Sequence, residues 1–290
     1  MGKPLKLGII GGSGLYAMPG LSGAWRAVET PWGPPSDAIL EGALEGLEVA
    51  FLPRHGRGHR VAPGELNARA NIAALKLLGC TAILAVGAVG SFREHLPPGH
   101  FALPEQIVDA TRGRQPSFFG DGIVAHVSLA VPVATDLVDR VETAAKAAGV
   151  PATRGITYCC MEGPQFATRA ESRARRAAGM DVVGMTAMPE AALAREAELA
   201  YALVSMVTDF DSWAESDVTT ASVLAVMEDN RTRAQALVRA VARELVANPL
   251  PVPSAQGWER ALDGAILTAR DRWPEATRQR LLPIAGRVLA

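Results

Sequence analysis

Cysteine is scarce in this sequence: Cys80, Cys159 and Cys160 are the three in the chain, and no CxxC motif occurs. Cys159 and Cys160 are sequence neighbours, an arrangement that rarely allows the two thiols to bridge each other. The pattern therefore predicts reduced thiols, no disulfide framework and no cysteine-based zinc site, as is typical of the cytoplasm.

An excess of positive charge is also missing, because 29 Lys and Arg residues face 30 Asp and Glu residues in 290 positions. A protein that neutralises the phosphates of a nucleic acid polymer needs such an excess, so we expect no polymer partner. No apolar run approaches the ~18–20 residues that span a bilayer, and residues 1–10 hold no signal peptide core. We therefore expect no membrane partner and a cytoplasmic location.

Hydrophobic residues make up 49% of the chain, which is enough for a large buried core. Short apolar runs predict strands over 5–10, 49–52, 82–86, 107–109, 182–185 and 203–208. Helical patterns separate them, over 66–79, 135–149, 168–179 and 189–200. This alternation indicates an α/β fold: a central, mostly parallel, twisted sheet covered by helices on both faces. Ligands of such sheets bind at the carboxyl ends of the strands.

The end of the chain has a different pattern. Residues 231–247 carry Leu and Val at helical spacing, residues 248–253 (NPLPVP) interrupt that helix, and amphipathic stretches follow over 257–271 and 275–289. No internal repeat or low-complexity tract separates this part. We expect a single domain over 1–290, with a core over about 6–247 and a C-terminal helical extension over about 248–290.

A glycine-rich loop, Gly11–Gly14, follows the first expected strand, and Gly12–Ala17 fits the GxGxxG/A fingerprint of dinucleotide binding. That fingerprint needs a following helix and an acidic residue at the end of the next strand. Pro19 would break the helix, and Glu29 enters a proline-rich loop instead. The remaining alternatives are binding of one anion by backbone and hydroxyl groups, or a plain tight turn.

Residues Pro53–Arg60 (PRHGRGHR) place five cationic or titratable side chains directly after an expected strand. Arginine offers a planar fork to phosphate oxygens, and a neighbouring histidine can add a donor. The alternative is a solvated basic loop. His55 and His59 have the spacing of a metal pair on a helix, but Gly56 and Gly58 disfavour a helix and no third ligand is evident, so we expect no metal.

Aromatic and acidic side chains mark two further candidate segments. Phe166 comes after the turn Gly163–Pro164 instead of lying in an apolar run, which favours a stacking platform over a core position. Asp209 and Asp211 end the strand over 203–208, and Trp213 nearby can exclude water and raise a carboxyl pKa. The alternative is a pair of solvated loop acids.

Together these segments resemble the trimeric purine nucleoside phosphorylase family, in particular its members that cleave 5'-methylthioadenosine. The resemblance extends over about residues 6–230 and rests on seven motifs in order: 8–15 (GIIGGSGL), 54–57 (RHGR), 67–71 (NARAN), 117–122 (SFFGDG), 162–166 (EGPQF), 184–190 (GMTAMPE) and 208–213 (TDFDSW).

The resemblance implies a glycosyltransferase of purine and methionine salvage. It would phosphorolyse 5'-methylthioadenosine to adenine and 5-methylthioribose 1-phosphate, with phosphate as co-substrate and neither cofactor nor metal. The implied phosphate site consists of Ser13, Arg54, His55, the backbone of Gly87 and Ala88, and Thr186. The implied nucleoside contacts are the Met185 backbone for ribose, Phe166 for stacking, and Asp209 and Asp211 for the base, with Asp209 as the catalytic acid.

The resemblance further implies a homotrimer in which His126 reaches the 5' pocket of a neighbouring subunit, with His59 as a second candidate for that role. Several positions depart from the family pattern. Ser13 replaces a more usual threonine, and Gly87 lacks the side chain with which relatives often bind phosphate. Ala167 and Thr220 occupy positions that tune the preference for the 5' group and the base.

Elementary chemistry agrees with these roles. Cleaving an N-glycosidic bond builds positive charge on the ribose and negative charge on the leaving purine. A bound phosphate can attack C1' and stabilise that cation, while a protonated Asp209 can donate to N7. The alternatives are a phosphorylase for 6-oxopurine nucleosides (methylthioinosine, or inosine and guanosine), a dinucleotide-dependent oxidoreductase and a non-catalytic scaffold. A carboxyl group at 209 favours the 6-amino purine.

Overall fold

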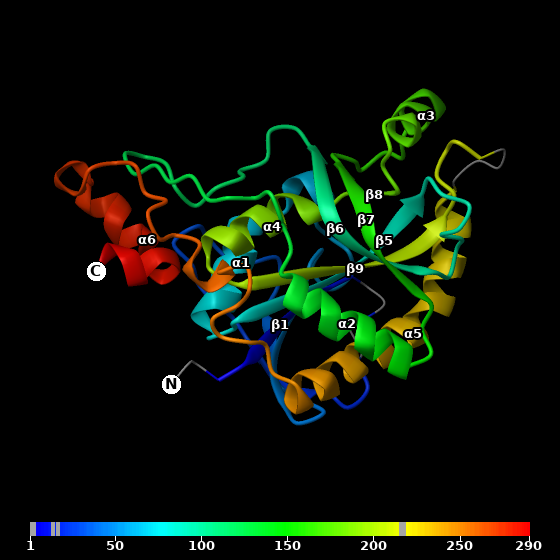
Figure 1. Cartoon of the computed structure of the whole chain (residues 1–290), viewed down its shortest axis with the longest axis horizontal. Helices are drawn as coiled ribbons and strands as arrows, with labels where there is room; N and C mark the ends of the chain where they lie inside the picture. Colours follow the sequence, from blue (N-terminus) through cyan, green and yellow to red (C-terminus); the bar gives the residue numbers. More distant parts are fainter. Residues whose placement is uncertain (1–3, 13–14, 16–17, 215–218) are drawn as a thin grey trace.

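The computed structural model describes residues 4–12, 15, 18–214 and 219–290. A nine-stranded mixed sheet forms its centre, in the order β2-β3-β4-β1-β5-β8-β7-β6-β9, and β5 also pairs with β9 (Figure 1). The strands are β1 (Lys6–Gly11), β2 (Ser22–Arg26), β3 (Ile39–Leu44), β4 (Leu47–Pro53), β5 (Ala82–Ser91), β6 (Phe101–Ala110), β7 (Ala152–Met161), β8 (Val182–Gly184) and β9 (Ala200–Asp209).

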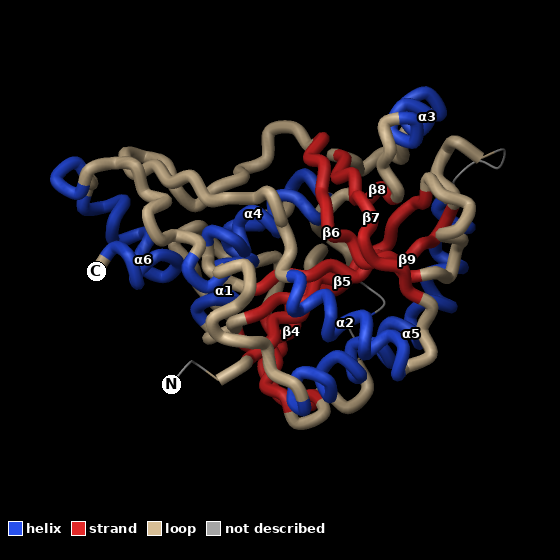
Figure 2. The backbone as a smooth tube through the Cα atoms, viewed as in Figure 1, coloured by secondary structure: helices blue, strands red, loops and turns tan. Residues whose placement is uncertain are grey.

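Helices pack on both sides of this sheet (Figures 1 and 2). Helix α1 contacts α4 on one side, and α2 contacts α5 on the other. The helices are α1 (Ala68–Leu77), α2 (Thr135–Ala147), α3 (Arg169–Ala177), α4 (Ala187–Glu196), α5 (Thr220–Ala247) and α6 (Glu275–Leu289). Helix α3 stands apart at one edge of the sheet, and within it only Ser172 is buried.

Strand β5 connects the two halves of the sheet. On one edge, the first residues of β5 pair with β1 and its last two, Gly90 and Ser91, pair with β8. On the other edge, β5 pairs with β9 along almost its whole length. The chain of pairings from β5 through β8, β7, β6 and β9 therefore returns to β5, as in a small barrel. A strand with neighbours on both edges and helices on both faces needs apolar residues throughout, which the sequence AILAV supplies.

The expected α/β architecture is confirmed, with strands parallel inside each of two groups. Strands β4, β1, β5 and β9 run one way, and β6, β7 and β8 run the other way. Antiparallel contacts join the groups: the last residues of β5 pair with β8, and Ser205 and Met206 of β9 pair with the start of β6. Because β8 has only three residues, its carboxyl end at Gly184 lies close to the carboxyl end of β5.

Three strands escaped the sequence prediction, and one expected helix is wrong. Strands β2 and β3 form an antiparallel edge and β7 begins with polar residues, so none shows a continuous apolar run. The stretch 257–271 forms only the 3-10 turns Trp258–Arg260 and Arg270–Arg272. Gly257 and Gly264 adopt positive φ there, which a continuous helix does not allow.

The C-terminal segment joins the main core and also holds the long loop after β6. Leu281, Ile284 and Leu289 of α6 belong to the same hydrophobic cluster as the strands. Residue Ala125 forms a β-bridge with Ile266, so the loop over 111–134 lies beside this segment (Figure 1).

Two further expectations concern chemistry and membranes. Cys80, Cys159 and Cys160 are buried free thiols, and burial raises the pKa of Cys80 and of Cys160 to about 12. Within the described ranges, every helix is too short or too polar to cross a bilayer.

Candidate active site

A cavity of about 300 Å³ opens where the carboxyl ends of the two strand groups meet. Ten residues expected at a ligand site line it, although they come from widely separated parts of the chain. They are Arg54, His55, Gly87, Ala88, Phe166, Ala167, Met185, Thr186, Asp209 and Asp211. Ser13 lies outside the described residues, while Gly12 beside it lines the cavity.

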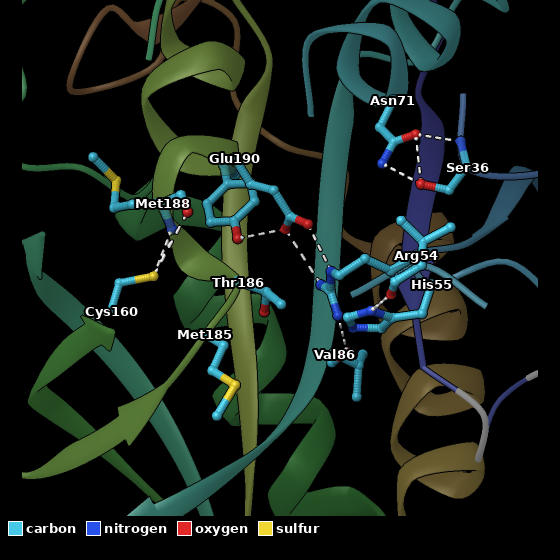
Figure 3. A network of polar contacts seen from close by, with 12 residues as sticks. Ser36, Arg54, His55, Asn71, Val86, Cys160, Met185, Thr186, Met188 and Glu190 are labelled. Atoms are coloured by element: carbon cyan, nitrogen blue, oxygen red, sulfur yellow. Dashed lines mark hydrogen bonds and ion pairs between the residues drawn. The ribbon is translucent and has the colours of Figure 1, made fainter. Parts of the chain in front are cut away.

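Arg54 is buried, and each of the three nitrogens of its guanidinium is hydrogen-bonded to the protein (Figure 3). Its Nε donates to Glu190 Oε1 at 2.6 Å and its Nη2 to Glu190 Oε2 at 3.3 Å, while Nη1 donates to the Val86 carbonyl. Burial alone would lower the Arg54 pKa, but the Glu190 carboxylate offsets it and keeps the pKa above its ordinary value. These bonds use three of the five N–H groups of an arginine, which leaves two for an anion in the cavity.

His55 is held as a neutral imidazole. Its Nδ1 lies 2.8 Å from the carbonyl of Val61, which can only accept, so Nδ1 carries the proton. Burial, together with the charge of Arg54, lowers the His55 pKa to about 4. Nε2 of the neutral ring is then an acceptor, whereas the sequence alone suggested a donor. The ring of His59 stacks on His55 at 4.5 Å and lines the cavity of its own chain.

The space between Arg54 and Thr186 is set by Gly87. A Cβ at this position would lie 3.6 Å from Arg54 Nη1 and 3.7 Å from Thr186 Oγ1, in ordinary van der Waals contact. A side chain at 87 would therefore project between the two groups that the resemblance assigns to phosphate. Because Gly87 has no side chain, the space between Arg54 and Thr186 stays open to a ligand.

Asp209 and Asp211 form the acidic end of the cavity. Burial is the main reason that the Asp209 pKa rises to about 6, and the neighbouring Asp211 adds to the rise. Thr208 Oγ1 donates to Asp209 Oδ2 at 2.7 Å. Burial also raises the Asp211 pKa, while a hydrogen bond from the Ser172 hydroxyl opposes the rise.

Two glycines allow close packing around the cavity, Gly90 against the two acids and Gly184 against Tyr158. A Cβ at Gly90 would meet Asp209 Oδ1 at 3.0 Å, and one at Gly184 would meet Tyr158 Oη at 2.1 Å. Strand β8 therefore packs directly on Tyr158, and Asp209 packs directly on β5.

Phe166 forms an open edge of the cavity, with 44% of its surface exposed, as a stacking platform requires. Ala167 beside it is buried, and its carbonyl accepts a hydrogen bond from Ser212.

Two predicted specificity residues lie away from the cavity lining. Thr220 is exposed at the start of α5, and the same helix presents Val223 and Met227 to the cavity instead. The His126 side chain is exposed on the long loop, and the backbone N–H of His126 donates to the Ala265 carbonyl.

Sequence analysis missed Glu190 as the partner of Arg54, and Tyr201, whose hydroxyl donates to Glu190 Oε2 at 3.2 Å. A signal for Glu190 exists, because it is an acid within the largely apolar stretch AMPEAALA of α4. Ser172 was also missed, and nothing in its sequence context marks it. Among the described residues, no cluster of three or more His, Cys, Asp or Glu side chains could hold a metal ion.

The fold and the cavity define an α/β protein whose cavity has a cationic end at Arg54 and an acidic end at Asp209 and Asp211. The chain belongs to the Phosphorylase superfamily, whose family model matches residues 6–243. Membership of this family favours a phosphorylase over a dinucleotide-dependent oxidoreductase or a non-catalytic scaffold.

Individual relatives extend the likeness over nearly the whole chain. The S-methyl-5'-thioadenosine phosphorylase of Rhodospirillum rubrum is 53% identical over 98% of this chain and 97% of its own length. A methylthioadenosine phosphorylase from an antarctic soil metagenomic library has a similar structure, with a TM-score of 0.91, 41% identity and coverage of 98% of this chain and 99% of that chain. The Schistosoma mansoni enzyme in complex with adenine has a TM-score of 0.85 and 34% identity, over 91% of this chain and 99% of that chain.

The buried ion pair generates a prediction about stability. Arg54→Ala leaves Glu190 buried without its cation, so we expect the free energy of unfolding to fall by about 3–5 kcal/mol. Chemical denaturation measures this change. The control is Arg26→Ala, which breaks an exposed ion pair with Glu41 and should change stability little. If Arg54→Ala proves as mild as Arg26→Ala, the structural role of the pair is wrong.

Proposed function

We propose that this chain cleaves 5'-methylthioadenosine with inorganic phosphate, giving adenine and 5-methylthioribose 1-phosphate. One observation carries the proposal: a single cavity joins a cationic end, built on Arg54, to a pair of buried carboxyl groups, Asp209 and Asp211, whose pKa values burial raises. The likeness to the named relatives supports the same substrate.

In the proposed reaction, phosphate binds between Arg54, His55 and Thr186, with Ser13 and the backbone of Gly87 and Ala88 completing its site. It attacks C1' of the ribose while the bond to the purine nitrogen breaks. The phosphate charge stabilises the developing cation on the sugar, and its fixed position removes much of the entropic cost of bringing it to C1'.

Neutral His55 suits the ionisation state of this co-substrate. Near neutral pH inorganic phosphate retains a P–OH group, and an acceptor nitrogen can take a hydrogen bond from it. Arg54 and Thr186 supply the donors that the charged oxygens need. The proposed site therefore offers both donors and an acceptor to monohydrogen phosphate.

At the other end, Asp209 protonates the leaving base. As a neutral acid it donates to N7 and accepts from the exocyclic amine of adenine, while Asp211 supports the base site and Phe166 stacks on the ring. A 6-oxopurine would place an acceptor where adenine has a donor, so the carboxyl group favours the 6-amino substrate. The reaction requires no organic cofactor and no metal ion, because positioned charges and donors supply the stabilisation.

We also propose that the enzyme works in the cytoplasm as a homotrimer, in which exposed His126 reaches the 5' pocket of a neighbouring subunit. Supporting observations are the exposure of His126 and the open edge of the cavity at Phe166. Sedimentation at assay concentration should give the mass of three chains, and His126→Ala should weaken use of the 5'-methylthio substrate without dissociating them. A fully active monomer would contradict this arrangement.

The proposed reaction is tested by identifying the free base. The protein is incubated with phosphate and, separately, methylthioadenosine, methylthioinosine, adenosine, inosine and guanosine. We expect phosphate-dependent release of adenine from methylthioadenosine, and little hypoxanthine from methylthioinosine. Preferential release of hypoxanthine or guanine would assign the chain to the 6-oxopurine alternative.

Asp209→Asn tests the choice of purine. The amide can donate to a 6-oxo group, so the ratio of kcat/KM for methylthioadenosine to that for methylthioinosine should fall, because mismatched buried polar groups are left unpaired. Since burial raises the Asp209 pKa to about 6, wild-type kcat/KM for methylthioadenosine should decline as pH rises through that value. Asp209→Asn should lack this decline.

Asp211→Asn is the matched control. It removes a neighbouring carboxylate and should lower activity without reversing the purine ratio. Free phosphate titrates in the same way in every assay. Its effect on the pH profile is therefore the same for the wild type, Asp209→Asn and Asp211→Asn. An unchanged ratio in Asp209→Asn would overturn the role assigned to Asp209.

A further inference from the structure

Arg114, in the loop that follows β6, is nearly buried. Its guanidinium donates hydrogen bonds to two chain segments that line the cavity. Its side chain is 8% exposed. Nη1 donates to the carbonyls of Met185 and Met188, both at 2.7 Å, Nη2 donates to the Glu162 carbonyl at 2.9 Å, and Nε donates to Glu162 Oε2 at 3.0 Å. Arg114 itself does not line the cavity.

The first of these segments, Met185–Met188, carries Met185 and Thr186 into the cavity. Its peptide between Met185 and Thr186 is held at both ends. The carbonyl accepts from Arg114, and the N–H of Thr186 donates to Tyr158 Oη at 3.4 Å. Because both ends are held, the peptide plane cannot rotate, and the Thr186 side chain keeps its direction toward the phosphate end (Figure 3).

The second segment begins at Glu162 and carries Phe166 and Ala167 to the other side of the cavity. Glu162 Oε2 also accepts the backbone N–H of Arg112 at 2.8 Å, so the carboxylate is fixed from two directions. The two segments touch, since a Cβ at Gly163 would lie 2.4 Å from Met185 Sδ. The Met185 side chain therefore packs directly on the backbone of Gly163.

We infer that Arg114 is a positioning residue of the active site, whose guanidinium holds Met185–Met188 and the Glu162–Ala167 segment in one fixed arrangement. The phosphate and ribose contacts then face the stacking platform across the same nucleoside. The inference rests on the proposed function for the identity of that nucleoside.

The geometry explains why arginine is required. A planar guanidinium presents donors to the Glu162 carboxylate, to the Glu162 carbonyl and to two further carbonyls at once. The ammonium of lysine is a single point with three donors, and it cannot reach both segments together. A loss of the fork therefore releases one segment from the other while both remain attached to their strands.

The experiment compares Arg114→Lys and Arg114→Ala with Arg154→Ala. Arg154 is the matched control, because it also bonds several acids, Glu105, Asp139 and Glu142, but lies away from the cavity lining. A small misplacement of reacting groups costs on the order of 10²-fold in rate, so we expect kcat/KM for methylthioadenosine to fall by about that factor in both Arg114 variants. Arg154→Ala should keep wild-type kinetics.

Two readouts separate positioning from a simple loss of stability. Assays run well below the melting temperature of each variant, and added guanidinium ion should restore part of the activity of Arg114→Ala by filling the vacated space. The same ion should not raise the activity of Arg154→Ala or the wild type. If Arg114→Ala fails to fold, Arg114→Lys decides the question by its kcat/KM at the same temperature.

The outcomes distinguish this inference from the proposed function. A wild-type protein that releases no adenine from methylthioadenosine overturns the proposed function, and adenine binding by calorimetry then tests Arg114 on its own. Weaker adenine binding in both Arg114 variants supports the positioning role. An active wild type whose Arg114 variants stay within about twofold of its kcat/KM, or bind adenine equally well, overturns the role of Arg114.

Discussion

The buried ion pair between Arg54 and Glu190 is the interaction on which the cavity depends. It joins the end of β4 to helix α4, which lies 136 residues further along the chain, and Tyr201 of β9 donates to the same carboxylate. A buried cation is tolerated only beside a fixed anion. The position of the cationic end of the cavity is therefore determined by a contact that lies outside the cavity.

Close packing around β5 shapes the acidic end of the cavity. Gly87 and Gly90 have no side chains, so Arg54, Thr186 and Asp209 can approach the strand from different elements. Close approach also removes water, and the removal of water raises the Asp209 pKa. Small residues at the end of a buried strand thus provide the space for the cavity and also raise the pKa of the Asp209 carboxyl group.

Much of this site was predictable, because apolar runs locate strands and strand ends locate ligands. Arg54, His55 and Asp209 each follow such a run, Phe166 follows a Gly-Pro turn, and the structure gathers them in one cavity. The contacts of α5 were not predictable, because Thr220 and Val223 lie one turn apart on the same side of the helix. Where the helix begins relative to the cavity decides that Val223, and not Thr220, lines it. Glu190 and Arg114 were not predictable either, because their roles depend on partners far away in the chain. The helix expected over 257–271 does not form. The prediction relied on the amphipathic pattern and gave too little weight to two glycines, which adopt positive φ in the structure.

Burial shifts the pKa values of His55 and Asp209 in opposite directions, and both shifts favour the neutral form of the side chain. It lowers the pKa of His55 to about 4 and raises that of Asp209 to about 6, because low polarity disfavours the charged form of each. Between these values both groups are neutral, one as an acceptor and the other as a donor. Arg54 alone keeps its charge, since Glu190 compensates for its burial. In the proposed reaction, the cavity thus receives phosphate at one end and releases a protonated base at the other without charging either side chain beforehand.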